Sequence, residues 1–145
     1  MLRFTKRADY GLMAVYYIAS HQEDGAVSSK RIAGTFSIPH ELLAKVLQQL
    51  ARKGLITGQN GPKGGYVLTR SPEEITVGQV IRVLEGPVKI VSCVESLDCP
   101  QYSRCNWRGP VQTIQASISQ LLDTMTMAEL ANDRVSPLAE LQGRY

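Results

Sequence analysis

The sequence predicts a mainly α-helical fold with one small β-hairpin. Apolar residues recur at spacings of three and four along much of the 145-residue chain. Two short strand-like runs flank a glycine-rich turn. The last long periodic segment carries almost no charge, unlike the helical segments before it. Together these three observations predict a helical domain, a hairpin and a separate long helix.

The composition is that of one globular domain. Hydrophobic residues make up 43% and charged residues 20% of the chain, and no apolar stretch approaches the ~20 residues that cross a bilayer. The N-terminal residues lack the apolar segment of a secretion signal, and three cysteines, an odd number, argue against a secreted disulfide framework. We therefore predict a cytoplasmic protein without membrane contact.

Three helical segments are predicted in the first third of the chain. Residues 7–21 have the pattern of an amphipathic helix. Ser28 or Ser29 is predicted to cap a short second helix. Pro39 lies at the start of the third, which ends at Gly54, because proline is favoured in the first turn of a helix and glycine after its end. The last two helices have the outline of a helix-turn-helix.

The hairpin follows this pair of helices directly. Residues 55–60 and 65–69 are the strand-like runs, and residues 61–64 form the tip. The tip is not a nucleotide phosphate loop, because that motif leads into a helix and ends in Gly-Lys-Ser or Gly-Lys-Thr. A helix-turn-helix followed by a two-stranded ribbon predicts a winged helix-turn-helix DNA-binding domain over residues 1–86.

The second half predicts a cysteine-bearing loop followed by a long helix. Thr76 caps a short helix that ends at Gly86. After the loop at residues 87–109, apolar residues repeat at alternating steps of three and four from Pro110 to Met125, and Thr126 is predicted to cap a final turn. In this segment, residues 110–131, Asp123 and Glu129 are the charged residues. So few charges favour a dimerisation helix, with ordinary core packing as the alternative. The remaining tail, residues 132–145, is expected to be loosely ordered or to join the dimer edge.

Charge is unevenly distributed between the two halves. Residues 1–70 hold ten Lys or Arg and four Asp or Glu, a net charge of +6, whereas residues 71–145 hold six and nine, a net charge of −3. The basic half is the candidate nucleic-acid surface, and a merely solvated basic face is the alternative.

The cysteines are the strongest chemical signal. Cys93, Cys99 and Cys105 lie on one polar loop with five residues between neighbours, whereas structural cysteines scatter through a core. Soft thiolates select iron–sulfur clusters or zinc, and zinc ligands usually pair at closer spacing, so an iron–sulfur cluster is favoured. With three thiolates, an incomplete or exchangeable fourth position suits a sensor. The alternative is a cluster-free regulator that uses redox thiols or zinc.

These features together resemble the IscR/NsrR family of bacterial iron–sulfur transcription regulators. The resemblance is carried by the wing tip at residues 61–66, the helix start at 76–81, the cysteine triplet and the segment at 126–130, and it covers residues 1–132. It implies a homodimeric winged-helix repressor or dual regulator, with a repressor favoured, whose cluster controls promoter binding. The signal is nitric oxide, redox state or iron–sulfur supply.

Within the family, the fourth cluster ligand separates subgroups. Members with a two-iron cluster have a histidine three residues after the last cysteine, where this chain has Arg108. Members with a four-iron cluster can use an aspartate near the start of the first helix, and Asp9 matches that position. The resemblance therefore favours a 4Fe-4S over a 2Fe-2S cluster, with Asp9 of the second subunit as ligand. Alternatively, Asp9 only complements the dipole of the first helical turn.

DNA contacts are expected from the second helix of the helix-turn-helix, from the helix before it and from the wing. Glu41 can accept from cytosine, while His40 and Lys45 can donate to guanine or to phosphate. At the wing tip, Asn60 replaces an arginine of many family members, and Lys63 only partly restores its charge. The full set of predicted contacts is Ser29, Lys30, Arg31, Pro39, His40, Glu41, Ala44, Lys45, Lys53, Asn60, Lys63 and Tyr66. A two-fold dimer predicts an inverted-repeat site in double-stranded DNA.

An enzyme or electron carrier is a third possibility that the sequence disfavours. The chain has no Ser/His/Asp constellation, no nucleotide loop and no paired carboxylates in a recognisable motif. An electron carrier also has no use for a basic winged helix. We therefore expect a binding protein and not an enzyme.

Overall fold

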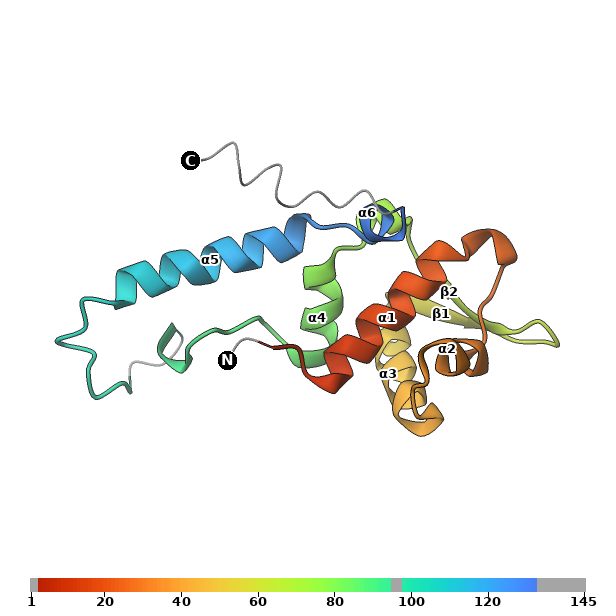
Figure 1. Cartoon of the computed structure of the whole chain (residues 1–145), viewed down its shortest axis with the longest axis horizontal. Coiled ribbons are helices and arrows are strands. Elements are labelled where there is room, and N and C mark those ends of the chain that lie inside the picture. The colour runs from red at the N-terminus through yellow and green to blue at the C-terminus, as the bar shows by residue number, and fades with distance from the viewer. Residues whose placement is uncertain (1–2, 95–97, 133–145) are drawn as a thin grey trace.

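The computed structural model describes residues 3–94 and 98–132. It is an elongated molecule with the helical domain and its hairpin at one end and a long helical arm at the other (Figure 1). The helices are α1 (Lys6–Ser20), α2 (Ser29–Phe36), α3 (His40–Arg52), α4 (Val77–Glu85), α5 (Arg108–Thr124) and α6 (Met127–Ala131). The strands are β1 (Ile56–Gln59) and β2 (Gly65–Leu68), and short 3-10 turns lie at Gln22–Asp24, Pro72–Glu74 and Ser92–Val94. The prediction of a mainly helical winged-helix fold is confirmed.

Side-chain caps begin several of these helices. Ser28 accepts from the backbone N–H of the third residue of α2, as predicted. Thr76 and Thr126 each form a capping box, in which the cap hydroxyl and a Gln or Glu three residues later satisfy backbone N–H groups reciprocally. Both threonines are the predicted caps. Because these capping signals are local, the helix starts predicted from the sequence agree with those in the structure.

The Thr126 cap offers a test of how far α6 depends on it. We expect Thr126→Ala to lower the free energy of unfolding by about 1 kcal/mol, because the Glu129 N–H loses its 3.2 Å hydrogen bond to the threonine hydroxyl. Thermal unfolding followed by circular dichroism measures this change. Thr124→Ala is the control, since that exposed hydroxyl only bonds back to a carbonyl of its own helix. Equal losses for both variants would contradict a specific role for the cap.

The core lies where α1, α3 and α4 meet. Leu43, Leu47 and Leu50 of α3 are fully buried, as is Ile18 of α1. Gly11 brings α1 and α4 close together, because a Cβ at this position would lie 2.1 Å from the Leu84 side chain. The core therefore holds one face of α3 against α1 and α4. The opposite face of α3 is exposed to solvent.

The hairpin is anchored to the helical domain by a third backbone segment. β1 and β2 pair antiparallel, with Ile56 opposite Leu68. Tyr66 also pairs with Val27, just before α2, through N–H···O contacts of 2.8 and 3.0 Å. A Cβ on Gly65 would come within 2.3 Å of the Val27 carbonyl oxygen, so this close approach requires glycine. Val27 thus ties the base of α2 to the wing.

The segment over residues 110–131, predicted as a dimerisation helix with a final turn capped by Thr126, is divided into two helices at that cap. α5 ends at Thr124, Met125 is extended, and α6 begins at Met127. The break arises because the backbone pairs with the start of α4: the Val77 N–H donates to the Met125 carbonyl at 2.9 Å, and the Met127 N–H to the Ile75 carbonyl at 2.8 Å. Tertiary pairing therefore overrides the apolar periodicity that runs through this region.

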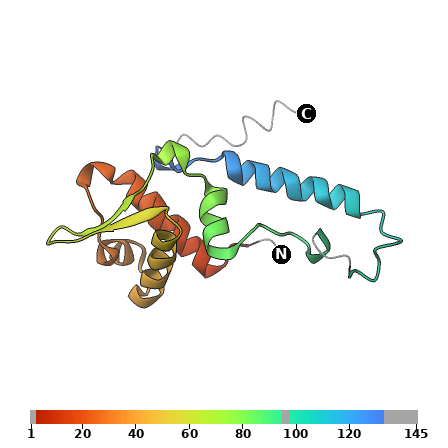
Figure 2. The same cartoon turned by 180° about the vertical axis from the view of Figure 1, so that it is seen from behind.

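α5 forms the arm together with the cysteine loop (Figure 2). At its base, Arg82 of α4 donates to Asp123 of α5 at 2.6 Å, over Gly78. Farther out, the Gln115 side chain accepts from the Ile90 N–H at 2.8 Å and donates to the Val88 carbonyl. The first residues of the loop, Val88 and Ile90, are thus held against α5. The predicted tail beyond Asn132 lies outside the described residues.

Candidate functional site

The exposed end of α3 carries the residues predicted to read bases. Pro39, His40, Glu41 and Lys45 are exposed, and Ala44 is half-buried. His40 Nε2 lies 3.1 Å from the Ser29 hydroxyl, a contact that joins the first residues of α2 and α3. The N-terminal face of α3 is therefore exposed and can enter a DNA groove.

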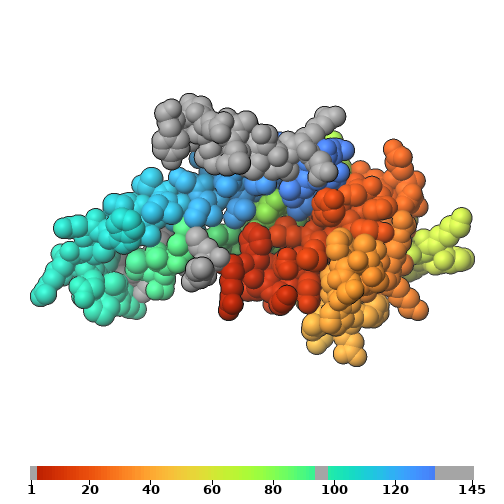
Figure 3. Space-filling model, viewed as in Figure 1, coloured from red at the N-terminus to blue at the C-terminus, as the bar shows by residue number. Residues whose placement is uncertain are grey.

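The wing projects beyond the body of the domain (Figure 3). Asn60 and Lys63 are exposed around its tip, whereas Tyr66 is half-buried at the point where the hairpin meets Val27. Tyr66 is thus part of the wing's anchor, in addition to being a predicted phosphate contact. Sequence reasoning missed Val27, because a single backbone pair between distant segments leaves no pattern in the sequence.

Arg31 differs from its predicted neighbours in being held by the protein. Its guanidinium donates to Asp24 at 3.0 Å and lies 5.6 Å from the centre of the Tyr17 ring. The hydrogen bond to Asp24 raises the pKa of Arg31, with Tyr17 as a further cause. Lys30 and Lys53, by contrast, are exposed and have no salt bridge among the described residues. Arg31 therefore has less freedom than these lysines to meet phosphate.

The three cysteines lie along the arm. Cys93 is in the turn Ser92–Val94, Cys99 precedes a turn closed by the Tyr102 N–H, and Cys105 lies just before α5. All three are free and half-buried. Within residues 3–94 and 98–132, no three Cys, His, Asp or Glu side chains lie close enough together to hold a metal ion. The described residues of a single chain therefore form no three-thiol site.

Asp9, the proposed fourth ligand, lies far from this loop in sequence and sits on another element. It is half-buried in the first turn of α1, where its own N–H bonds to the Thr5 carbonyl at 3.0 Å. The cysteine loop starts beside the segment before α1, where Val88 and Phe4 line one pocket, and runs outward along the arm to α5 (Figure 1). In the part of the chain that the structure describes, Asp9 belongs to no group of three Cys, His, Asp or Glu side chains that could hold a metal ion. Asp9 and the cysteines of one chain are therefore not brought together.

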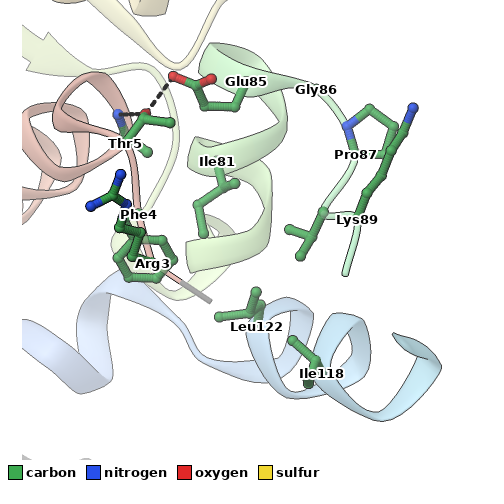
Figure 4. Close-up of a pocket in the computed structure, with 12 residues that line it drawn as sticks. Arg3, Phe4, Thr5, Ile81, Glu85, Gly86, Pro87, Lys89, Ile118 and Leu122 are labelled. Carbon is green, nitrogen blue, oxygen red and sulfur yellow. Dashed lines mark hydrogen bonds between the residues drawn. The ribbon is translucent and has the colours of Figure 1, made fainter. Parts of the chain in front are cut away.

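An apolar pocket of about 450 Å³ lies where the arm meets the winged-helix domain (Figure 4). Phe4 lines one side, Ile81 of α4 the back, and Ile118 and Leu122 of α5 the other side. At its upper edge the Thr5 hydroxyl donates to Glu85 at 2.6 Å. The residues that line the pocket form no catalytic constellation. Phe4, which lines it, is also exposed to solvent.

The geometry defines a class of protein. The second helix of a helix-turn-helix is exposed beside a projecting wing, and both lie in the basic half of the chain. This arrangement is that of a winged-helix DNA-binding transcription regulator. Residues 4–133 match the Rrf2 family, described as "Iron-dependent Transcriptional regulator", and the chain belongs to this family. The family resemblance drawn from the motifs is thereby confirmed, as is the prediction that the chain is not an enzyme.

Several known regulators are similar along nearly the whole chain. The HTH-type transcriptional regulator CymR of Bacillus subtilis is 32% identical over 90% of this chain and 91% of its own. IscR of Yersinia pseudotuberculosis is 29% identical over 92% and 81%. Among solved structures, B. subtilis CymR, called the global cysteine regulator, has a TM-score of 0.73 over 91% of this chain and 98% of its own. IscR of T. potens, 30% identical, has a TM-score of 0.74 over 94% and 90%.

No helix in the described part of the chain is both long enough and apolar enough to cross a membrane.

Proposed function

We propose that this chain is a homodimeric transcription regulator, most simply a repressor, whose DNA binding is controlled by an iron–sulfur cluster on the arm. The observation that carries the proposal is the presence of three free, half-buried cysteines on one loop. The iron-dependence in the family's description supports it. Nitric oxide, redox state or iron–sulfur supply is the signal.

The donor set fits such a cluster. Cys93, Cys99 and Cys105 are unpaired thiols, and thiolate is the ligand that iron–sulfur clusters use. When bound, the cluster supplies a centre that small oxidants can reach. Asp9 of a second copy serves as the fourth ligand, because the described residues of one chain form no group that could hold a metal ion. The match of Asp9 to the aspartate position of four-iron family members favours a 4Fe-4S centre. The chain's part is to supply the three thiols from one loop.

The exposed apolar residues of α5 support a homodimer. Ile114 and Leu121 are exposed and lie one heptad apart, about two helical turns. Phe4 is 52% exposed beside the base of the arm. Only Asp123 is charged in α5 after its first residue, and it is paired with Arg82. An apolar stripe of this kind is stable in water when a second copy covers it.

For DNA recognition, α3 enters the major groove of an inverted-repeat site. His40, Glu41 and Ala44 face base edges from its N-terminal half, supported by Pro39. Lys45 on the same helix donates to guanine or to phosphate. Contacts to the DNA backbone come from Ser29, Lys30, Arg31, Lys53, Asn60, Lys63 and Tyr66.

A cluster-free thiol regulator is the second candidate function. A specific comparison favours it: CymR of Staphylococcus aureus, 27% identical and with a TM-score of 0.72, has been solved in an oxidised form, and B. subtilis CymR is called a cysteine regulator. In this alternative the same three thiols respond to oxidation directly, or hold zinc.

Anaerobic purification with an absorption spectrum and iron and sulfide counts separates the candidates. We expect a brown protein with a broad band near about 400 nm and about four irons per chain. Asp9→Ala should lose or alter this spectrum, whereas Glu23→Ala, which removes an exposed carboxylate outside α1, should not. About two irons with structured bands at longer wavelength would indicate a 2Fe-2S centre with another fourth ligand. A colourless wild-type protein would refute the cluster and favour the thiol or zinc alternative.

A further inference from the structure

A groove between α1 and α3 gathers positive charge beside the helix proposed to read DNA. Its volume is about 440 Å³. The residues lining it are Lys6, Arg7 and Tyr10 from α1, and Leu42, Lys45 and Gln49 from α3. Lys6, Arg7 and Lys45 are all exposed, and none of the described residues that line the groove has a carboxylate. Three cations without a counter-charge make a site for an anion.

The arginine of this groove is positioned by three elements. The Arg7 guanidinium donates to the Gln49 side-chain oxygen, and the Gln49 amide donates to the Val83 carbonyl of α4 at 2.9 Å. Gln49 itself is half-buried. Because its amide is anchored to α4, Gln49 can hold the guanidinium in place while that group keeps further N–H donors for a ligand.

The other cations are placed by their helices. Lys6 lies in the first turn of α1, with its ammonium 5.9 Å from the centre of the Tyr10 ring. Lys45 lies one turn before Gln49 on the same side of α3, with exposed Leu42 between the two helices. The cations therefore converge from both helices on the space above Leu42.

We propose that this groove binds a backbone phosphate of duplex DNA next to the major groove that α3 enters. The inference rests on the proposed DNA face of α3. A helix in the major groove has a sugar–phosphate strand along its flank, and phosphate contacts from another element fix its register. The groove lies on that flank, and its charge is complementary to a phosphodiester. Arg7 and Lys45 bind the phosphate, and Gln49 is a positioning residue that acts through Arg7.

This assignment gives Lys45 a phosphate contact instead of a base contact. Sequence reasoning left both open, because the helical pattern shows only that Lys45 is exposed. It also adds Arg7 to the interface. Arg7 lies outside the helix-turn-helix and the wing, so the sequence pattern does not indicate it as a DNA contact. Its hydrogen bond to Gln49, 42 residues later in the chain, places it in the groove beside α3.

The test is the salt dependence of DNA binding by the full-length protein. The probes are a duplex that the wild-type protein selects from a random library and an unrelated duplex of equal length. We expect Arg7→Gln and Lys45→Gln each to weaken binding to both duplexes by the same factor, about tenfold. The slope of log affinity against log salt should become shallower by about 0.9 for each lost phosphate contact.

Two further variants separate charge placement from folding. Gln49→Glu puts a carboxylate beside Arg7 and should reduce affinity and slope as Arg7→Gln does, with thermal unfolding monitored to verify the fold. Arg70→Gln removes an exposed cation that follows β2 and lines no part of the groove, so it should keep the wild-type slope. A wild-type slope for Arg7→Gln, or a loss confined to the selected duplex, would overturn the phosphate assignment.

Two other outcomes are distinguishable. Calorimetry with inorganic phosphate at constant ionic strength checks for a free-anion site. Phosphate binding that Arg7→Gln abolishes while the DNA slope stays unchanged would overturn the proposal in favour of that site. A wild-type protein that binds no duplex in any cluster state would overturn both the inference and the proposed DNA face. If the wild-type protein binds DNA with a steep salt dependence and the variants keep both its affinity and its slope, the phosphate site in the groove is refuted. The proposed DNA face of α3 then still stands.

Discussion

Replacing Cys99 with Ser is expected to leave the anaerobically purified protein without colour and without bound iron. Cys99 is the middle ligand of the proposed three, free and half-buried on a turn that also exposes Ser103. A serine hydroxyl is a hard, weakly acidic donor and does not replace a thiolate toward iron. We therefore expect the iron count to fall from about four per chain to background.

Ser103→Ala is the matched control for this variant, because it alters a side chain of the same loop without removing a thiol. Iron and sulfide counts should equal those of the wild type. Trp107, the single tryptophan of the chain, is 60% exposed and two residues after Cys105, so its fluorescence provides a second readout. We expect the bound cluster to quench this fluorescence and the Cys99→Ser protein to lack the quenching. A Cys99→Ser protein that keeps the full iron content and the fluorescence of the wild type would remove Cys99 from the ligand set.

Gly65→Ala is expected to have the largest effect among substitutions in the wing. The added Cβ would lie 2.3 Å from the carbonyl oxygen and 2.4 Å from the carbonyl carbon of Val27, and backbone atoms cannot move aside as a flexible side chain can. Either the Val27–Tyr66 pair opens or the hairpin shifts. Overpacking of this kind typically costs about 1–3 kcal/mol, so the midpoint of denaturant unfolding should fall.

The wing variant also has a matched control. Gly34→Ala places a Cβ in open space on α2, where alanine is the better helix former, and it should be neutral or stabilise the protein by about 0.5–1 kcal/mol. Gly65→Ala should in addition weaken DNA binding, since the wing and the start of α2 share the Val27 anchor. Equal unfolding midpoints for the two variants would contradict the close approach at Gly65.

The sequence by itself was enough for the elements and for the class of protein. The caps Ser28, Thr76 and Thr126 and the glycine-rich wing tip act within a few residues, so their signals are local and readable. The cysteine triplet is likewise defined by residue type and spacing alone. The exposed face of α3 followed from its periodicity.

Only the tertiary structure decided how these elements are joined. The break between α5 and α6 results from backbone pairing with residues 75–77, some fifty positions earlier in the chain. Pairing of Arg31 with Asp24, of Arg82 with Asp123 and of Arg7 with Gln49 selects which cations are free and which are held. A periodic pattern reports which face of a helix is apolar, but a polar contact between two helices depends on their packing. For that reason the charged groove between α1 and α3 emerges only when the helices are placed side by side.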